Sequence, residues 1–415
     1  MQLSSLLILI ICVVSIICML VRPRGIKEAY WACGGALLLV ATRLLPVRQA
    51  GQAVYKGVDV YLFLTGMMIL AEMAREEGVF DWIADVAGHR AQGSSKRLFL
   101  LVYLAGTVVT ALLSNDATAV VLTPAVLAVV RKAKINPKPH LLACAFIANA
   151  ASFVLPISNP ANLVIFAKHM PPLMRWLGIF TLPSIAAVVV TFIVLRWMLR
   201  SELEGLIQDL KVPVELTTEG KLALSGLVLA GVALIAASAM GLDLGAPTCG
   251  AALVALLIVA WRDRGVVKHV ATGVSWAVIP LVAGLFIMVQ ALEVAGVLRL
   301  VVTGLERVAC LPATLGNLVA AFNVGVISNV MNNLPVGLLS SAAIHAAQPS
   351  GSLVNAVLIG VDLGPNLSVT GSLATILWLI ALRREKVEIT AWQFLAIGVV
   401  AMPLALLSSV LLLRK

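Results

Sequence analysis

Long apolar segments are the feature that most limits how this chain can fold. Residues 3–21 and 391–413 carry no charged side chain, and similar segments recur throughout the 415 residues. A transmembrane helix needs about 20 consecutive apolar residues. A chain that is 61% hydrophobic and 12% charged has too little polar surface for a soluble domain of this size. A transmembrane β-barrel would instead show alternating segments of about ten residues. The sequence therefore predicts an all-α polytopic membrane protein.

A polar cluster interrupts this apolar pattern in the first half of the chain. Between two long apolar runs lie Ser114, Asn115, Asp116, Thr118 and Thr123. Polar groups in hydrocarbon must be satisfied by the protein or face water, so a break of this kind usually lines a cavity. The alternative interpretation is an ordinary loop between two membrane helices.

Comparable breaks recur at a nearly constant spacing. Ser328-Asn329 matches Ser114-Asn115 at 328 − 114 = 214 residues, and a break over 362–375 matches one over 149–162 at 362 − 149 = 213. This recurrence indicates an internal duplication. Interrupted apolar segments in corresponding positions of two halves are a good sequence indicator of a transporter's binding site.

The duplication predicts two repeats joined by a short connection. We expect an N-terminal repeat over 1–199, a polar cytoplasmic linker over 200–220 and a C-terminal repeat over 221–415. Each repeat is predicted to hold about five transmembrane helices, one re-entrant hairpin and one broken helix at a central site. The hairpins are expected near 97–131 and 312–346, and the broken helices near 140–168 and 353–382.

Charge distribution supports an inverted relation between the repeats. The hairpin arms 98–113 and 117–130 are short for full spans and are flanked at both ends by Lys and Arg, which favours re-entry from the cytoplasm. Five spans per repeat is an odd number, so the second repeat would be inverted, with both termini outside. Most of the 30 Lys and Arg residues then lie in the cytoplasm, as the positive-inside rule requires. The alternative topology has about fourteen full spans.

Other classes of function find little support. The net charge of +10 comes from short loops, where it sets orientation, so it is no sign of nucleic-acid binding. The six cysteines lack metal-type spacing, so we expect no metal and no cofactor. The chain has no Gly-rich phosphate loop with Lys-Ser/Thr, so it is not expected to bind ATP in that manner. We expect a transporter in the lipid bilayer, not an enzyme.

The breaks supply a mostly neutral lining of amides and hydroxyls, which suits a small polyhydroxy solute or an oxyanion. Carboxylates stand at two of them, Asp116 and Asp362. Loss of solvation at membrane depth favours the protonated carboxyl, so both are predicted to couple transport to protons. The alternative role for Asp116 is a helix cap. The predicted substrate-binding residues are Ser114, Asn115, Ser158, Asn159, Asn329, Asn332, Asn333, Gly371 and Ser372.

Three motifs give the chain a family resemblance. Leu113-Ser-Asn-Asp-Ala-Thr-Ala-Val-Val-Leu-Thr-Pro124, Ser328-Asn-Val-Met-Asn-Asn-Leu-Pro335 and the segment from Gly360 to Trp378 resemble ArsB-type arsenite and antimonite efflux proteins of the ion transporter superfamily. The first motif also occurs in sodium–proton antiporters and anion carriers of that superfamily. The resemblance implies inverted repeats, re-entrant hairpins, and location in a bacterial inner membrane. It also implies export of trivalent arsenic or antimony driven by protons, sometimes with a separate ArsA-type ATPase.

The chain departs from that family pattern at three places. Family members often have Asp where this chain has Asn149 and Lys where it has Asn366; they often have Thr-Pro where it has Ser368-Val369. These changes move any proton role onto Asp116 or Asp362. The substrate chemistry still agrees, because arsenite at neutral pH is mostly the uncharged triol As(OH)3 and the breaks contain no thiol that would hold it too tightly.

The sequence therefore predicts a secondary transporter that exports arsenite or antimonite in exchange for protons. Two alternatives remain open at this point. One is a sodium–proton antiporter or a small organic-anion carrier on the same fold. The other is a channel subunit powered by a separate cytoplasmic ATPase.

Overall fold

The protein is all-helical, as the apolar segments predict. A computed structural model describes residues 3–166, 170–205 and 215–413. The first half contains α1 (Leu3–Val21), α2 (Glu28–Ala41), α3 (Val47–Lys56), α4 (Val58–Glu76), α5 (Val79–Arg90), α6 (Ser95–Leu112), α7 (Thr123–Lys132), α8 (Lys138–Ala150), α9 (Pro160–Phe166) and α10 (Leu173–Met198).

The second half follows with α11 (Thr218–Ala239), α12 (Gly245–Ala260), α13 (Gly265–Gly273), α14 (Val278–Val294), α15 (Val297–Ala309), α16 (Ala313–Met331), α17 (Asn333–Ala347), α18 (Gly351–Leu363), α19 (Leu373–Arg384) and α20 (Ala391–Leu411). Helices α1–α10 and α11–α20 thus follow each other in matching order. Several pairs are similar in length; α8 and α18 each have 13 residues, and α6 and α16 have 18 and 19. The duplication itself stays a prediction.

One detail of the predicted repeat is wrong. Ser328 and Asn329, expected at the second break, lie inside α16. That helix ends at Met331, and the break is at Asn332, whose φ is +74°. Asn332 follows Ser114 by 332 − 114 = 218 residues, the spacing that also separates the starts of α6 and α16 (313 − 95). The polar pair stays helical because its side chains bond to carbonyls one turn back, Ser328 to Val324 at 2.9 Å and Asn329 to Gly325 at 2.8 Å.

Two predicted boundaries fall partly on residues that are not described. The linker predicted at 200–220 begins with a 3-10 turn at Arg200–Leu203, and residues 206–214 lie outside the described residues. The first broken helix, predicted at 140–168, corresponds to α8 and α9 with a break between them; residues 167–169 lie outside the described residues.

Seven helices among the described residues are long and apolar enough to cross a membrane, or eight if the bent pair α3–α4 counts as one span. Their outward faces carry large apolar side chains, such as Ile193 at 57% and Val228 at 58% exposure, as a lipid environment requires. Helices α6 and α16 belong to the seven, so they are longer than the short arms expected from sequence. The re-entrant hairpins and the inverted orientation stay predictions.

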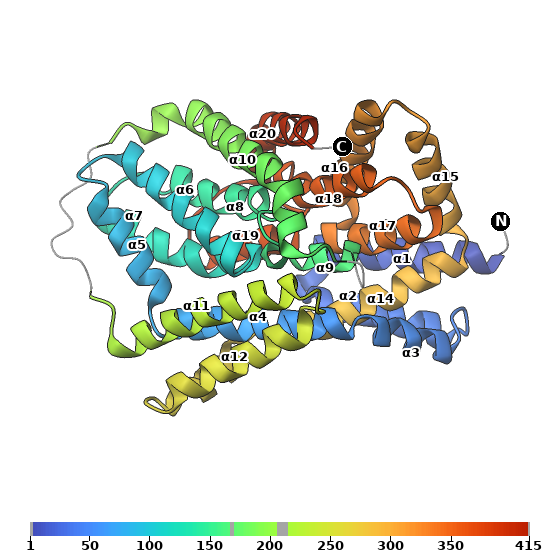
Figure 1. The fold of residues 1–415 in the computed structure, drawn as a ribbon, viewed down its shortest axis with the longest axis horizontal. Coiled ribbons are helices and arrows are strands. Elements are labelled where there is room, and N and C mark those ends of the chain that lie inside the picture. The colour runs from blue at the N-terminus through green and yellow to red at the C-terminus, as the bar shows by residue number, and fades with distance from the viewer. Residues whose placement is uncertain (1–2, 167–169, 206–214, 414–415) are drawn as a thin grey trace.

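The helices form two layers (Figure 1). One layer, here called the framework, consists of α1–α4 and α11–α14, in which α4 packs on α12 and α14 packs on α2. The other, here called the site module, consists of α5–α10 and α15–α20, in which α6 packs on α8, α16 on α18 and α10 on α20. Figure 1 shows α4, α11, α12 and α14 along one side and α6, α8, α10, α16 and α18 along the other. Each half of the chain contributes to both layers.

Small residues set the close crossing of α16 and α18 inside the site module. A Cβ atom on Gly360 would lie 2.5 Å from the Ala321 carbonyl oxygen, and one on Gly364 would lie 2.6 Å from the Cα of Gly325. Backbones this close require residues without a side chain, as is common where membrane helices pack. The crossing holds the end of α18, where the second broken helix is interrupted, against α16.

Candidate functional site

The two broken helices meet through a hydrogen-bonded pair of amides. Asn149, at the end of α8, donates from Nδ2 to Asn366 Oδ1 at 3.1 Å, and Asn366 donates to the Phe146 carbonyl at 3.1 Å. Ser372 donates to Asn149 Oδ1 at 3.3 Å and lies 2.7 Å from the Thr375 hydroxyl. Asn149, Asn366, Ser372 and Thr375 are almost fully buried. This neutral cluster joins the repeats at the centre of the site module.

A second contact between the breaks involves a carboxylate. Asn159 Nδ2 donates to Asp362 Oδ1 at 2.7 Å, while Asn159 Oδ1 accepts from the backbone N–H of Ala161 at 3.0 Å. Asp362 is completely buried, and its Oδ2 has no hydrogen-bond partner. A buried carboxylate with a free oxygen is unusual, because such groups are normally fully hydrogen-bonded.

Asn329 fastens the second break to α16. Its Nδ2 donates to the Gly325 and Gly364 carbonyls at 2.8 and 2.9 Å, and its Oδ1 accepts from Ser368 N at 3.0 Å and Ser368 Oγ at 2.7 Å. Thr370 donates to the Asn329 carbonyl at 2.8 Å. The Asn329 amide is therefore fully engaged within the protein and has little capacity left for a solute.

The turns that follow α6 and α16 face the breaks. At the first turn, Ser114 Oγ accepts from Ala117 N at 3.2 Å, and residues Ala117–Leu122 continue as a π-helical segment into α7. At the second turn, Asn332 Oδ1 accepts from Leu334 N at 3.3 Å, and Asn333 N donates to the Gly371 carbonyl at 2.8 Å. Helix turns of π type frequently occur at functional sites.

The turns after α6 and α16 border a small cavity between the framework and the site module. Its volume is ≈ 50 Å³. The framework side is mostly apolar, with residues of α1, α4 and α14, and it includes one acid, Glu28 of α2. The polar lining on the site module comes from Asn115, Asp116, Asn159, Asn332, Asn333 and Ser372.

A larger cavity of ≈ 600 Å³ lies next to the small one. Asp116 lines both, together with Leu64, Pro160, Val278 and Leu373. From there the large cavity extends to charged residues near the ends of α4, α5 and α19, which are Glu72, Arg75, Asp81, Arg384 and Glu385. It connects the polar site to one charged end of the molecule.

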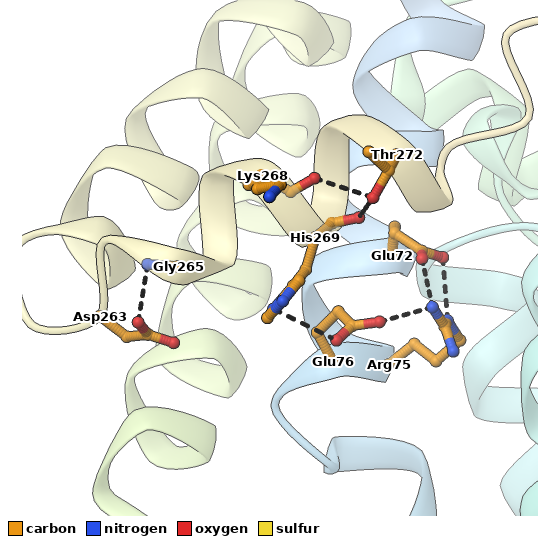
Figure 2. Close-up of polar contacts among 8 residues, drawn as sticks. All are labelled: Glu72, Arg75, Glu76, Asp263, Gly265, Lys268, His269 and Thr272. Carbon is orange, nitrogen blue, oxygen red and sulfur yellow. Dashed lines mark hydrogen bonds and ion pairs between the residues drawn. The ribbon is translucent and has the colours of Figure 1, made fainter.

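The framework edge of that cavity is organised by an ion-pair network (Figure 2). Arg75 contacts both carboxylate oxygens of Glu72, one of them at 3.0 Å from Nε, and reaches Glu76 at 2.5 Å. His269 of α13 lies 3.8 Å from the other oxygen of Glu76. The carboxylate of Glu72 lies against Gly273, where any side chain would overlap it. The network holds α13 against the end of α4.

The structure gathers most of the residues predicted from sequence but divides them into two groups. Asn115, Asn159, Asn332, Asn333 and Ser372 line the small cavity, and Ser114 lines the large one.

Ser158, Asn329 and Gly371 lie behind the cavity lining. Ser158 donates to the Ala111 carbonyl at 3.0 Å, and Gly371 packs against Pro365. Of the predicted coupling residues, Asp116 lines both cavities and Asp362 lines neither, although it bonds to the lining residue Asn159.

Sequence reasoning missed Glu28. An acid in the first turn of a helix is normally explained by the helix dipole, so nothing in the sequence marked this one as facing a cavity. Its nearness to Arg22 in a short loop was the available signal. Among the described residues, no group of three or more His, Cys, Asp or Glu side chains could hold a metal ion, and no cysteine lines either cavity.

A membrane-spanning helical fold with broken helices beside a cavity that has several polar lining residues is typical of a membrane transporter. The chain belongs to the citrate transporter (CitMHS) family, whose model matches residues 7–363. It is 26% identical to an arsenical pump membrane protein of Escherichia coli over 407 residues, which cover 94% of this chain and 93% of the relative. It is also 30% identical to an uncharacterized transporter of Mycobacterium tuberculosis over 430 residues, 95% of each.

Two further comparisons also match membrane transport proteins. An arsenical pump membrane protein of Yersinia enterocolitica is 27% identical over 408 residues, 94% of this chain and 93% of the relative. The resemblance to ArsB-type proteins is thereby confirmed. The crystal structure of the Alcanivorax borkumensis YdaH transporter has a TM-score of 0.61 over 90% of this chain and 89% of that one. At 16% identity, this last likeness concerns the fold alone.

Proposed function

We propose that this protein is a secondary transporter that exports arsenite or antimonite from the cytoplasm in exchange for protons. The observation that carries the proposal is the small cavity, whose polar lining on the site module consists of four amides, one hydroxyl and one carboxyl. Amides and hydroxyls can both donate to and accept from the three hydroxyls of As(OH)3. The arsenical pump relatives, matched along 94% of this chain, support the same substrate.

The size of the small cavity also supports a small solute. A single ordered water needs roughly 10–15 Å³ of such space. A cavity of ≈ 50 Å³ therefore has room for a few water-sized groups, which suits an atom bearing three hydroxyls. It has no room for a tricarboxylate unless the two layers separate.

The charge of the lining argues against an organic anion. Among the described residues lining the small cavity, the ionisable ones are Glu28 and Asp116, both acids. An anionic substrate would meet no cationic side chain in this lining, and it would be repelled by Asp116 whenever that carboxyl is ionised. A neutral triol avoids that repulsion, so arsenite fits better than citrate despite the family name.

Absence of a thiol from the cavity walls fits a transporter that must release its cargo. The six cysteines are free, and none lines either cavity among the described residues. Several thiolates around trivalent arsenic would hold it too tightly, whereas hydrogen bonds to hydroxyls allow modest affinity and fast release.

We assign proton transfer to two carboxyls in this scheme. Asp116 lies where the two cavities join, and Asp362 is buried beside the lining residue Asn159. Acids buried at membrane depth are commonly found in proton relays. We further infer location in a bacterial inner membrane, with both termini outside and the large cavity opening to the cytoplasm; an ArsA-type ATPase is an optional partner.

The test is arsenite uptake into everted vesicles that contain only this protein, with an imposed proton gradient and no ATP. Accumulation that a protonophore abolishes is the expected result. Uptake that does not depend on the proton gradient and requires an added ATPase would support a channel subunit instead. Failure with both arsenite and antimonite in energised vesicles would overturn the proposal, and sodium and small organic anions would be tried next.

A further inference from the structure

The small cavity has an acid on each of the two layers that enclose it. Asp116 belongs to the site module, and Glu28 is the first residue of α2 in the framework. Asp116 lines both cavities, whereas Glu28 lines only the small one. A solute or proton that enters from the large cavity therefore meets Asp116 first and can meet Glu28 only through the small cavity.

Glu28 is held inside the protein by one charged partner. It is 8% exposed, and its carboxylate pairs with Arg22, whose side chain is 18% exposed. The other residues that line the cavity from α1, α4 and α14 are apolar, and they include Met19, Leu64 and Leu281. The ionisable groups near Glu28 are thus Arg22, which pairs with it, and Asp116, which lines the same cavity from the other layer. Arg24 and Lys27 are exposed at the surface.

A purely structural role explains this pair poorly. An exposed acid in the first turn would favour the helix dipole equally well. A buried ion pair contributes little net stability, because the loss of hydration offsets most of the attraction. Acids retained inside membrane proteins are instead commonly functional, and the cavity gives this one access to the transport site.

We propose that Glu28 is the second proton-carrying carboxyl of the transport cycle and exchanges a proton with Asp116 through the small cavity. The inference rests on the proposed proton-coupled export. In the step, the O–H bond of a protonated Asp116 breaks and an O–H bond forms on the Glu28 carboxylate. Asp116 becomes the anion, and Arg22 keeps its proton throughout. The reverse step uses the same atoms.

Occupancy of the small cavity would then couple the two fluxes. With ≈ 50 Å³, it can hold a few waters that relay the proton, or one small triol, but not both. When arsenite occupies the cavity, the relay between Asp116 and Glu28 is interrupted. When arsenite leaves, water returns and the proton can pass. Export and proton entry alternate because they use the same volume.

The experiment compares Glu28→Gln with wild type and with Glu293→Gln, an exposed acid on α14, in proteoliposomes. Two assays are run, net arsenite export driven by a proton gradient and exchange of labelled for unlabelled arsenite without a gradient. We expect Glu28→Gln to lower net export about 100-fold, as loss of a proton-transfer group does. Exchange by Glu28→Gln should fall far less than its net export, because exchange needs no proton transfer. Glu293→Gln should leave both assays within about twofold of wild type, because Glu293 lines neither cavity.

Net export by Glu28→Gln at the wild-type rate would overturn the inference. Loss of exchange as well would also overturn it, because Glu28 would then act on the substrate or the fold. The double variant Arg22→Gln/Glu28→Gln removes the unpaired Arg22 that could unfold the single variant, and it should give the same split between the two assays. If wild type itself exchanges no arsenite, the proposed function fails, whatever Glu28 does.

Discussion

The amides of Asn149 and Asn366 share a hydrogen bond of 3.1 Å that joins the two broken helices. The ArsB resemblance leads one to expect Asp and Lys at these positions. The structure pairs Asn366 with Asn149, and it pairs Asp362 with Asn159. A neutral amide pair thus occupies the two positions where the resemblance implies Asp and Lys.

We expect Asn149→Asp alone to destabilise the protein and Asn149→Asp/Asn366→Lys to restore it. In the single variant a buried carboxylate faces Asn366 Oδ1, and an unpaired buried charge costs roughly 3–5 kcal/mol. A lysine at 366 supplies a donor and the opposite charge. The measurement is the apparent Tm of each purified variant in detergent. A double variant no more stable than the single one would contradict the pairing.

Replacing Asp362 by Asn should abolish proton-driven export and leave the protein folded. The amide keeps an oxygen that can accept from Asn159 Nδ2, now at 2.7 Å from the carboxylate, but it cannot bind and release a proton. Gradient-driven arsenite uptake in everted vesicles measures the loss, and size-exclusion elution measures the fold. Wild-type uptake in this variant would remove Asp362 from the coupling scheme.

Asn329→Ala should mainly lower the stability of the protein, whereas Asn115→Ala should mainly weaken arsenite binding. Asn329→Ala leaves two carbonyls and the Ser368 donors without their partner. Each unsatisfied buried group costs about 1–3 kcal/mol, so the apparent Tm should fall clearly.

Asn115 lines the cavity and accepts from the neighbouring Asp116 N–H at 2.9 Å. Its change to Ala should mainly raise the KM for arsenite. Equal losses of stability in both variants would show that this division between structural and lining residues is wrong.

Gly371→Ala tests how tightly the second break is packed. A Cβ at this position would overlap Pro365 and lie 2.7 Å from Asn329 Oδ1. Overpacking of this kind costs about 1–3 kcal/mol. Gly231→Ala in α11 is the matched control, because no atom lies within 4 Å of the added carbon and alanine favours the helix by about 1 kcal/mol. Thermal unfolding should separate the two, and similar Tm values would contradict the predicted crowding.

The apolar pattern was sufficient to predict the helical class and the position of most helices. Breaks at Ser114 and near Pro156 and Gly364 also follow from sequence, because Gly, Pro and clustered polar residues interrupt apolar helices. The residues matched to the second break were one turn too early, since Ser328 and Asn329 satisfy their side chains on their own helix. Local sequence does not reveal that choice.

The division of labour among the predicted site residues was also beyond the sequence. Asn329 and Asn332 are three residues apart and chemically identical, yet one bonds to a distant break and the other faces the cavity. Whether such an asparagine bonds within the protein or faces the cavity depends on partners more than thirty residues away in the sequence. Glu28 was missed for the same reason, because its cavity is formed mostly by residues far along the chain.

The duplicated turns differ in one respect that matters for direction. Asn115 and Asn333 are equivalent at 333 − 115 = 218 residues, and both line the small cavity. The next residue is Asp116 in the first turn and Leu334 in the second. Two matching halves would give the fold nearly the same shape at both ends. Shape alone would therefore not favour transport of the substrate in one direction. Because only the first turn carries an ionisable side chain, the two ends of the molecule differ chemically. A proton gradient across the membrane can then set the direction of transport.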